Sequence, residues 1–444
     1  MSEYDDAGGD TAREAPTRRD YVRYGGAVVG GGLLAGCSSR SGGESTPSET
    51  TTETGRTTET DTATETGTAT EADRSYSVSM EPVGEVSFES VPEELIAHKL
   101  SQDVALAVGH GDAIVESIGE GGYFTAFYEM LPDVEVPDQS EWDGIRTGDG
   151  ALDKERVYEI DPDLIAIDPN WLLTWASADD DDIPELVENV APFFGNFSRE
   201  KRSESWANWP DGEYAHYDLY ELTERWGQLF QERERARAII DMNRSLVEEV
   251  QSRLPPEDER PSVALPHAIA PRGGEIWAYN PASDVTKTDG KKQYRDLNVR
   301  DALAGMSDGA ARVTFDAEAM LEADPDVIFL QFALAFFRTD ATEFFDSADA
   351  EGSTVVEYTI ERYRNDPVLS ETAAVQNDRI YAGTNTSHGP IINMFNTEVL
   401  AKQLYPDIFG EWPGFNEDGS YDLPAEERLF DRGRIADIAN GIPR

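Results

Sequence analysis

Runs of four consecutive apolar residues recur along the chain, and two of them follow segments that match each other. The matching segments are residues 152–163 and 315–326, and the apolar runs after them are residues 164–167 and 327–330. The two units align without a gap. A strand that is apolar at every position is buried on both faces, as in the parallel sheets of α/β proteins. The pattern therefore predicts two similar α/β lobes.

Both units carry the same helix signals. Asp153 and Asp316 stand at the expected N-caps, where a short side-chain oxygen can accept hydrogen bonds from the first backbone N–H groups. Glu155 and Glu318 follow in the first turn, where the helix dipole favours negative charge. An Asp-Pro-Asp tripeptide then ends each segment, because proline cannot continue a helix. Each unit is predicted to be one helix followed by one strand.

The longest helical pattern in the chain lies between these units. It runs over residues 217–254, contains Gly227 as its only glycine, and ends at Pro255-Pro256. After Gly227 the apolar positions keep the spacing of one helix face, so this part can bridge two domains as a rigid strut. The chain is therefore predicted to divide into an N-terminal α/β lobe at 76–230, a connecting helix at 231–256 and a C-terminal α/β lobe at 257–444.

The N-terminal residues have the pattern of an export signal. Arg18 and Arg19 precede a short, glycine-rich apolar segment at 25–35, and the sequence Leu-Ala-Gly-Cys then ends at Cys37. The apolar segment is too short for a stable membrane span and matches the apolar part of a twin-arginine signal. Residues 1–36 are therefore predicted to be a lipoprotein signal, with Cys37 lipidated as the new N terminus.

Residues 37–75 are dominated by threonine, serine, glutamate and glycine. Such a segment cannot bury an apolar core, so we expect a disordered, hydrated tether. A tether behind a lipid anchor would hold the remaining residues just outside a membrane.

Charge and cysteine content narrow the possible functions. The 444 residues include 88 acidic and 37 basic side chains, for a net charge of −51, and only one cysteine. This negative field argues against nucleic acid as a partner. A single cysteine excludes an intramolecular disulfide and a multi-thiolate metal site. So large an acidic excess suits a halophilic protein, because molar salt screens the self-repulsion over about 3 Å.

The order of these motifs resembles a known family. The chain is similar to the substrate-binding lipoproteins of ABC importers for ferric siderophores, haem and vitamin B12, here as a haloarchaeal-type twin-arginine lipoprotein. The resemblance covers about residues 84–409 and rests on both Asp-Pro-Asp units and on segments 91–96, 105–112, 367–381 and 401–409. It implies two Rossmann-like lobes joined by one long α-helix, and a monomeric binding protein rather than an enzyme.

The resemblance also implies partners. An ABC permease and its ATPase would receive the ligand at the outer face of the cell membrane. In this family a glutamate near the start of the repeated helix of each lobe docks on arginines of the permease. Glu155 and Glu318 match those positions, although stabilisation of the helix dipole also accounts for an acid there.

Ligands of open α/β sheets bind beyond the carboxyl ends of the strands. The strands are predicted at 164–167, 262–265, 327–330 and 379–382. Aromatic and basic side chains follow them, and the selected ligand-binding candidates are Trp171, Trp175, Arg272, Trp277, Tyr279, Arg338 and His388. Aromatic faces and arginines suit a large, flat, anionic ligand, and a siderophore-type Fe(III) chelate fits best. No resident cofactor is expected.

Other ligands remain open. The same fold could bind cobalamin, or haem through an axial His267 or His388. Bare Zn²⁺ or Mn²⁺ is less favoured, because the five histidines form no paired spacing and no metal site is predicted. The lysine-rich segment 286–295 is either a solvated loop or an anion-attracting rim of the site.

A secreted hydrolase is the alternative from a different class. Asp161 and Asp163 could in principle act as paired carboxylates. However, the same aspartates recur in the second unit, which favours a structural turn. The sequence also lacks a nucleophile elbow, a Walker loop and a His-Glu-x-x-His motif.

Overall fold

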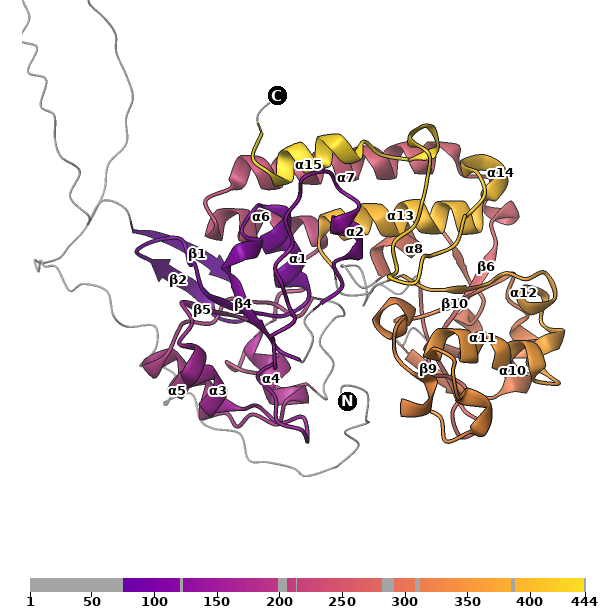
Figure 1. The fold of residues 1–444 in the computed structure, drawn as a ribbon, viewed down its shortest axis with the longest axis horizontal. Helices are drawn as coiled ribbons and strands as arrows, with labels where there is room; N and C mark the ends of the chain where they lie inside the picture. The colour runs from indigo at the N-terminus through magenta and orange to yellow at the C-terminus, as the bar shows by residue number, and fades with distance from the viewer. Residues whose placement is uncertain are drawn as a thin grey trace, which may run out of the picture. The chain divides into compact units, whose positions relative to one another are not determined.

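A computed structural model describes residues 75–442 except 120–122, 199–205, 213, 282–290, 308–311 and 385–387. The predicted export signal, Cys37 and nearly all of the predicted tether lie outside the described residues. The described chain is a mixed α/β structure with two lobes, as the sequence predicts (Figure 1).

The N-terminal lobe is built on a parallel sheet with strand order β4-β3-β5. Helices cover both faces, because alternate strand residues enter different cores. Leu95 and Ala97 of β3 pack with apolar residues of α1 and α6, whereas Ile96 packs with those of α3, α4 and α5. The elements are β3 Leu95–Ala97, β4 Ile114–Ser117, β5 Leu164–Ala166, α1 Leu100–Ala107, α2 Ala126–Glu129, α3 Lys154–Ile160, α4 Pro169–Trp175, α5 Asp182–Asn189 and α6 Leu219–Leu229. An antiparallel hairpin of β1 Tyr76–Met80 and β2 Gly84–Phe88 precedes them.

The C-terminal lobe contains a mixed sheet with strand order β11-β10-β6-β7-β9, and β8 also pairs with β6. Strands β6, β8, β10 and β11 are parallel, whereas β7 and β9 are antiparallel to their neighbours. The strands are β6 Ser262–Pro266, β7 Ile276–Tyr279, β8 Arg300–Asp301, β9 Arg312–Phe315, β10 Val327–Leu330 and β11 Ile380–Ala382. The helices are α8 Lys292–Asp296, α9 Ala304–Ser307, α10 Ala317–Ala323, α11 Val355–Asn365, α12 Ala373–Gln376, α13 Pro390–Leu404, α14 Pro406–Phe409 and α15 Arg432–Ala439.

The repeated Asp-Pro-Asp units have a structural role in both lobes. The first aspartate ends α3 or α10 in the left-handed conformation, at φ 52° in Asp161 and 41° in Asp324. The second accepts backbone hydrogen bonds from the start of the lobe's central strand. Asp163 Oδ2 lies 2.9 Å from the amide nitrogen of Glu93, and Asp326 Oδ2 lies 2.7 Å from that of Ser262. These carboxylates therefore fix the helix-to-strand turn, which explains the repeat without catalysis.

The long helical pattern at 217–254 forms two helices rather than one. Helix α6 ends at Leu229, and α7 spans Arg233–Arg253, within the range predicted for the connecting helix. Gln231 turns the chain between them with a φ of 57°. Gly227 marks their contact, because a Cβ atom there would lie 2.5 Å from Ala236 Cβ. The missing side chain of Gly227 thus allows α6 and α7 to pack closely.

Helices α7, α13 and α15 pack together and share one core with parts of both lobes (Figure 1). Phe127 of the N-terminal lobe stacks on Phe395 of α13 with ring centroids 4.9 Å apart. The C-terminal segment is held to α13 by the buried carboxylate of Glu398. It accepts from Tyr421 Oη at 2.6 Å and from Arg432 Nη2 at 2.9 Å. The sequence pattern did not predict this shared helical layer.

The contact between α6 and α7 can be tested by filling it. We expect Gly227→Val to lower the free energy of unfolding by about 1–3 kcal/mol, because the added carbons have no space against Ala236. Gly305→Val in α9 is the matched control, since nothing lies within 4 Å of a Cβ atom there. Denaturant unfolding would measure both variants. Equal losses would show that the helix contact is not the cause.

Candidate ligand-binding site

The parallel strands of each lobe end side by side, so the residues after them share one edge. Ala97 of β3 pairs with Ala166 of β5, and Leu330 of β10 pairs with Ala382 of β11. In the N-terminal lobe a pocket lies at this edge. Its polar and aromatic lining includes His98, Ser101, Asp168, Asn196, Phe197 and Ser198.

Short-range contacts fix the pocket walls. The single O–H of Ser101 lies between two acceptors, with Oγ 2.7 Å from Ala166 O and 2.9 Å from His98 O, which ties the start of α1 to both strand ends. Gly195 passes so close to β5 that a Cβ atom would lie 2.5 Å from the carbonyl carbon of Ile167. Asn196 donates to Glu81 O and Ala215 O, while its Oδ1 has no partner among the described residues. The pocket therefore offers one buried acceptor.

Asp168 organises the wall opposite α1. Its carboxylate caps α4 through the amide of Asn170 at 2.9 Å and also accepts from the amide of Phe197 at 2.7 Å and from Tyr214 Oη. Burial raises the pKa of Asp168, and these hydrogen bonds act in the opposite direction. All of its described contacts hold the walls together, so Asp168 is a positioning residue.

Aromatic side chains gather beside this pocket. We call His98, Trp171, Trp175, Phe197 and Trp206 the N-lobe aromatic cluster. The ring centroids of His98 and Trp171 lie 4.7 Å apart, and Trp175 lies 5.1 Å from Phe197 and 4.8 Å from Trp206. The guanidinium of Arg146 lies 5.8 Å from the Trp171 ring, and its Nε donates to Gly150 O at 2.7 Å. A cation is thus held against the cluster.

The C-terminal lobe has a comparable group at its own strand ends. We call His267, Trp277, Tyr279, Phe332 and Phe336 the C-lobe aromatic cluster. His267 follows β6 as His98 follows β3, and its ring centroid lies 5.7 Å from Trp277 and 5.1 Å from Phe332. The ammonium of Lys291, which is only 3% exposed, lies 5.0 Å from the Tyr279 ring. This cluster too carries a cation on an aromatic face.

Polar groups give the C-lobe cluster hydrogen-bonding capacity. His267 Nδ1 accepts from the amide of Ile269 at 3.2 Å, so the neutral ring carries its proton on Nε2 and presents a donor there. Gln331 follows β10 beside His267, and both atoms of its buried side-chain amide lack partners among the described residues. These groups suit a ligand with oxygen acceptors.

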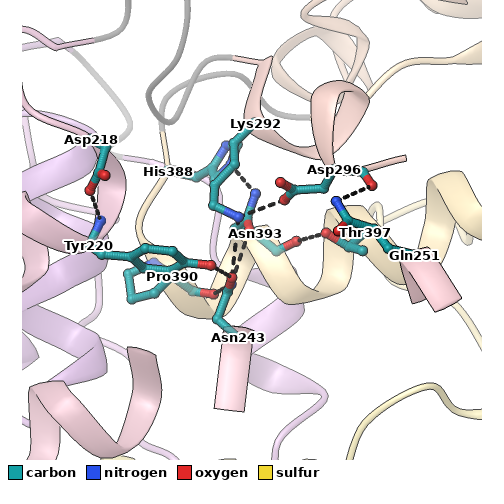
Figure 2. Close-up of polar contacts among 10 residues, drawn as sticks. All are labelled: Asp218, Tyr220, Asn243, Gln251, Lys292, Asp296, His388, Pro390, Asn393 and Thr397. Atoms are coloured by element: carbon teal, nitrogen blue, oxygen red, sulfur yellow. Dashed lines mark hydrogen bonds and ion pairs between the residues drawn. The ribbon is translucent and has the colours of Figure 1, made fainter. Parts of the chain in front are cut away.

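The structure distributes the sequence-predicted residues over the two aromatic clusters, the exposed surface and the buried start of α13. Trp171 and Trp175 lie in the N-lobe aromatic cluster, and Trp277 and Tyr279 lie in the C-lobe one. Arg272 and Arg338 are exposed, and neither belongs to a cluster. His388 is fully buried beside α13, where its Nε2 meets Asn393 (Figure 2). Its Nδ1 lies 3.3 Å from Asn396 Nδ2. Lys291 belongs to the predicted basic rim, whereas Lys287 lies outside the described residues.

Several cluster residues were not selected from the sequence. His98 could have been found by comparing the lobes, since a histidine follows the first parallel-sheet strand of each. Arg146, Phe197 and Trp206 lie in segments without a strand or helix pattern, so only the folded chain brings them to the site.

Two further findings bear on the class of site. Within the described ranges, no three His, Cys, Asp or Glu side chains gather closely enough to hold a metal ion. None of the described helices combines the length and hydropathy required to cross a bilayer.

The chain is similar to several solved structures. A periplasmic binding protein from Veillonella parvula is 12% identical, with a TM-score of 0.50, and the match covers 75% of this chain and 98% of that one. Staphylococcus aureus SirA, complexed with staphyloferrin B, is 14% identical, with a TM-score of 0.47 and coverages of 74% and 98%. Bacillus subtilis FeuA, complexed with ferri-bacillibactin, is 15% identical, with a TM-score of 0.47 and coverages of 72% and 95%.

A comparison with family profiles gives the assignment, although no curated protein sequence matches the chain. The profile described as "Periplasmic binding protein" matches residues 134–386, which is more than half of the chain. The matched range contains most of both aromatic clusters, the connecting helix and both Asp-Pro-Asp turns. The chain belongs to the periplasmic binding protein family.

Proposed function

We propose that this protein is the substrate-binding component of an ABC importer and that it captures an Fe(III) chelate of the siderophore type. One observation carries the proposal: each lobe places an aromatic cluster with an associated cation at the carboxyl ends of its parallel strands. Ligands of open α/β sheets bind at this edge. A ligand held by both clusters would contact aromatic faces and positive charge in each lobe.

The chemistry of the clusters favours an anionic chelate with flat, unsaturated groups. Aromatic rings bind such groups by stacking, and Arg146 and Lys291 supply charge for carboxylate, catecholate or hydroxamate oxygens. In a chain with a net charge of −51, two cations at the site are a local exception to the overall field. Salt would screen the long-range repulsion of an anionic ligand while leaving these short contacts effective.

Haem is the second candidate, because both clusters contain a histidine. The hydrogen bond from Ile269 to His267 Nδ1 leaves the proton of the neutral ring on Nε2, so that atom would have to lose it to bind iron. A chelate that brings its own oxygen ligands needs no such change. The same reasoning disfavours capture of bare Zn²⁺ or Mn²⁺.

The proposal includes export and anchoring by the twin-arginine signal and Cys37, with a monomer acting at the outer face of the membrane. Support comes from the sequence motifs of residues 1–37 and from the acidic composition, which suits molar salt. An ABC permease and its ATPase would be the partners that accept the ligand.

The ligand class can be tested by tryptophan fluorescence in molar KCl. The chain carrying Cys37→Ser would be titrated with a ferric hydroxamate, ferric citrate, haem, cobalamin, Zn²⁺ and Mn²⁺. We expect saturable quenching by one iron chelate and none by the free metals. A response to Zn²⁺ or Mn²⁺ alone, or to none of the six while the chain is folded, would contradict the proposal.

The aromatic contribution can be isolated with two tryptophans of similar burial. We expect Trp175→Ala to raise the Kd for that chelate about tenfold, equivalent to about 1.4 kcal/mol, because the N-lobe aromatic cluster loses its central ring. Trp412→Ala is the control, since Trp412 packs on Phe415 and Tyr421 instead. An unchanged Kd for Trp175→Ala would remove this cluster from the site.

Permease docking is proposed for Glu155 and Glu318, which are exposed in the first turns of α3 and α10. We expect Glu155→Arg with Glu318→Arg to reduce ligand uptake by at least about tenfold while ligand affinity stays unchanged, because the charges would repel permease arginines. Glu159→Arg with Glu322→Arg, exposed on the same helices, is the matched control. Equal uptake by the two double variants would exclude the docking role.

A further inference from the structure

A chain of buried polar side chains joins the connecting helix to elements of both lobes (Figure 2). We call Tyr220, Asn243, Lys292, His388 and Asn393 the polar junction. Asn243 lies on α7, Tyr220 on α6, Lys292 on α8 and Asn393 on α13, with His388 just before α13. Asn243, His388 and Asn393 are fully buried, and Lys292 is 8% exposed. Tyr220 is half-buried. The hydrogen bonds among Asn243, Asn393 and His388 are therefore sheltered from water, and their orientation matters.

Two partners fix the orientation of Asn243. Lys292, as an ammonium, can only donate, and its Nζ lies 3.4 Å from Asn243 Oδ1. The carbonyl of Pro390 can only accept, and it lies 2.9 Å from Asn243 Nδ2. Tyr220 Oη adds a donor to Oδ1 at 2.8 Å. The oxygen of Asn243 must therefore face α8 and α6, and its nitrogen must face α13.

That orientation passes along to His388. Asn243 Nδ2 also donates to Asn393 Oδ1 at 3.0 Å, so the remaining amide group of Asn393 is its Nδ2. Asn393 Nδ2 lies 3.3 Å from His388 Nε2. Because an amide nitrogen can only donate, Nε2 must accept, and a neutral ring then carries its proton on Nδ1. Asn396 Nδ2 lies 3.3 Å from Nδ1, so this tautomer requires the Asn396 amide to turn its oxygen toward the ring and accept that proton. The hydrogen bonds run in one direction, from Lys292 through Asn243 and Asn393 to His388.

Some charged groups near the junction oppose a positive charge on His388, and others favour it. Lys292 opposes a positive charge on His388. Two carboxylates favour a positive charge on His388. Asp296 pairs with Lys292 at 2.6 Å, and Asp103 of α1 accepts from the amide of Gly389. Among the described residues, further titratable or charged side chains lie at these groups: Tyr128 and Tyr123 at Asp103, and Arg244 at the Tyr220 ring. Protonation would in every case set Nε2–H against the N–H of Asn393.

We propose that the polar junction is a proton-sensitive latch that sets the angle between the lobes. While His388 is neutral, the junction ties α7 and α6 to the start of α13. Protonation makes Nε2 of His388 a donor, so the Asn393 amide turns its oxygen toward the ring and loses the contact with Asn243 that ties α7 to α13. The latch therefore loosens in acid and lets the lobes move. This inference needs only the fold and stands apart from the ligand assignment.

The tautomer of His388 is the first test. The chain with Cys37→Ser and ¹⁵N-labelled histidine would be studied by NMR, with His388→Gln identifying the His388 signals. We expect the Nδ1–H tautomer at pH 7.5, with Nε2 showing the shift of a hydrogen-bond acceptor. An Nε2–H tautomer, or a protonated ring at that pH, would overturn the latch.

Lobe movement is the second test. Spin labels on Asp181→Cys and Asp349→Cys, both exposed and one in each lobe, would report the interlobe distance in a Cys37→Ser background. We expect the distance distribution to broaden between pH 7.5 and 5.0. His388→Gln should not broaden, because its amide oxygen accepts in place of Nε2 and does not titrate. Identical wild-type distributions at the two pH values, or equal broadening in His388→Gln, would refute the proposal.

Two further variants keep the test decisive if His388→Gln does not fold. Asn393→Asp supplies an acceptor on both sides, so it should hold a protonated His388 and keep the distribution narrow at pH 5.0. His110→Gln removes a titrating histidine outside the junction, whose pKa is lowered by burial, and should broaden as the wild type does. Wild-type broadening in Asn393→Asp, or its loss in His110→Gln, would contradict the latch.

Discussion

In each lobe, one carboxylate fixes where the parallel strands lie against each other. Asp163 and Asp326 accept hydrogen bonds from backbone amides at or just before the central strands, so the end of one helix and the start of a distant strand are tied at the same level. Because the strands are short, the position of this hydrogen-bonded tie along them also determines which residues follow at their carboxyl ends. The placement of His98 and His267, and of the rings around them, follows from it.

Connection of the lobes has a different physical basis. Helices α7 and α13 share an apolar core with α2 and α15, while polar side chains are buried where α7 meets α6, α8 and α13. Apolar packing tolerates small sliding movements, whereas buried hydrogen bonds demand a specific orientation. The apolar layer thus limits how far the lobes can separate, and the polar contacts select a preferred angle within that limit.

The sequence predicted what depends on local pattern. The two Asp-Pro-Asp units and the strands of the two-lobe α/β fold lie in strongly periodic segments. Four of the cluster residues, Trp171, Trp175, Trp277 and Tyr279, lie within or just after such segments. The left-handed conformation of Gln231, which separates α6 from α7, could not be predicted, because neither a glycine nor a proline stands at that position. His388 was assigned to the ligand by its position after a strand, yet burial among asparagines places it at the junction. Arg146, Phe197 and Trp206 depend on loop geometry, which residue patterns do not encode.

In the function proposed for this protein, both aromatic clusters hold one iron chelate. The most direct measurement is a crystal structure of the saturated protein, with anomalous scattering recorded at the iron edge. We expect a single strong iron peak whose chelating ligand contacts Trp175 in one lobe and Tyr279 in the other. An iron peak away from both clusters, or bound directly by protein side chains in place of chelate oxygens, would contradict it.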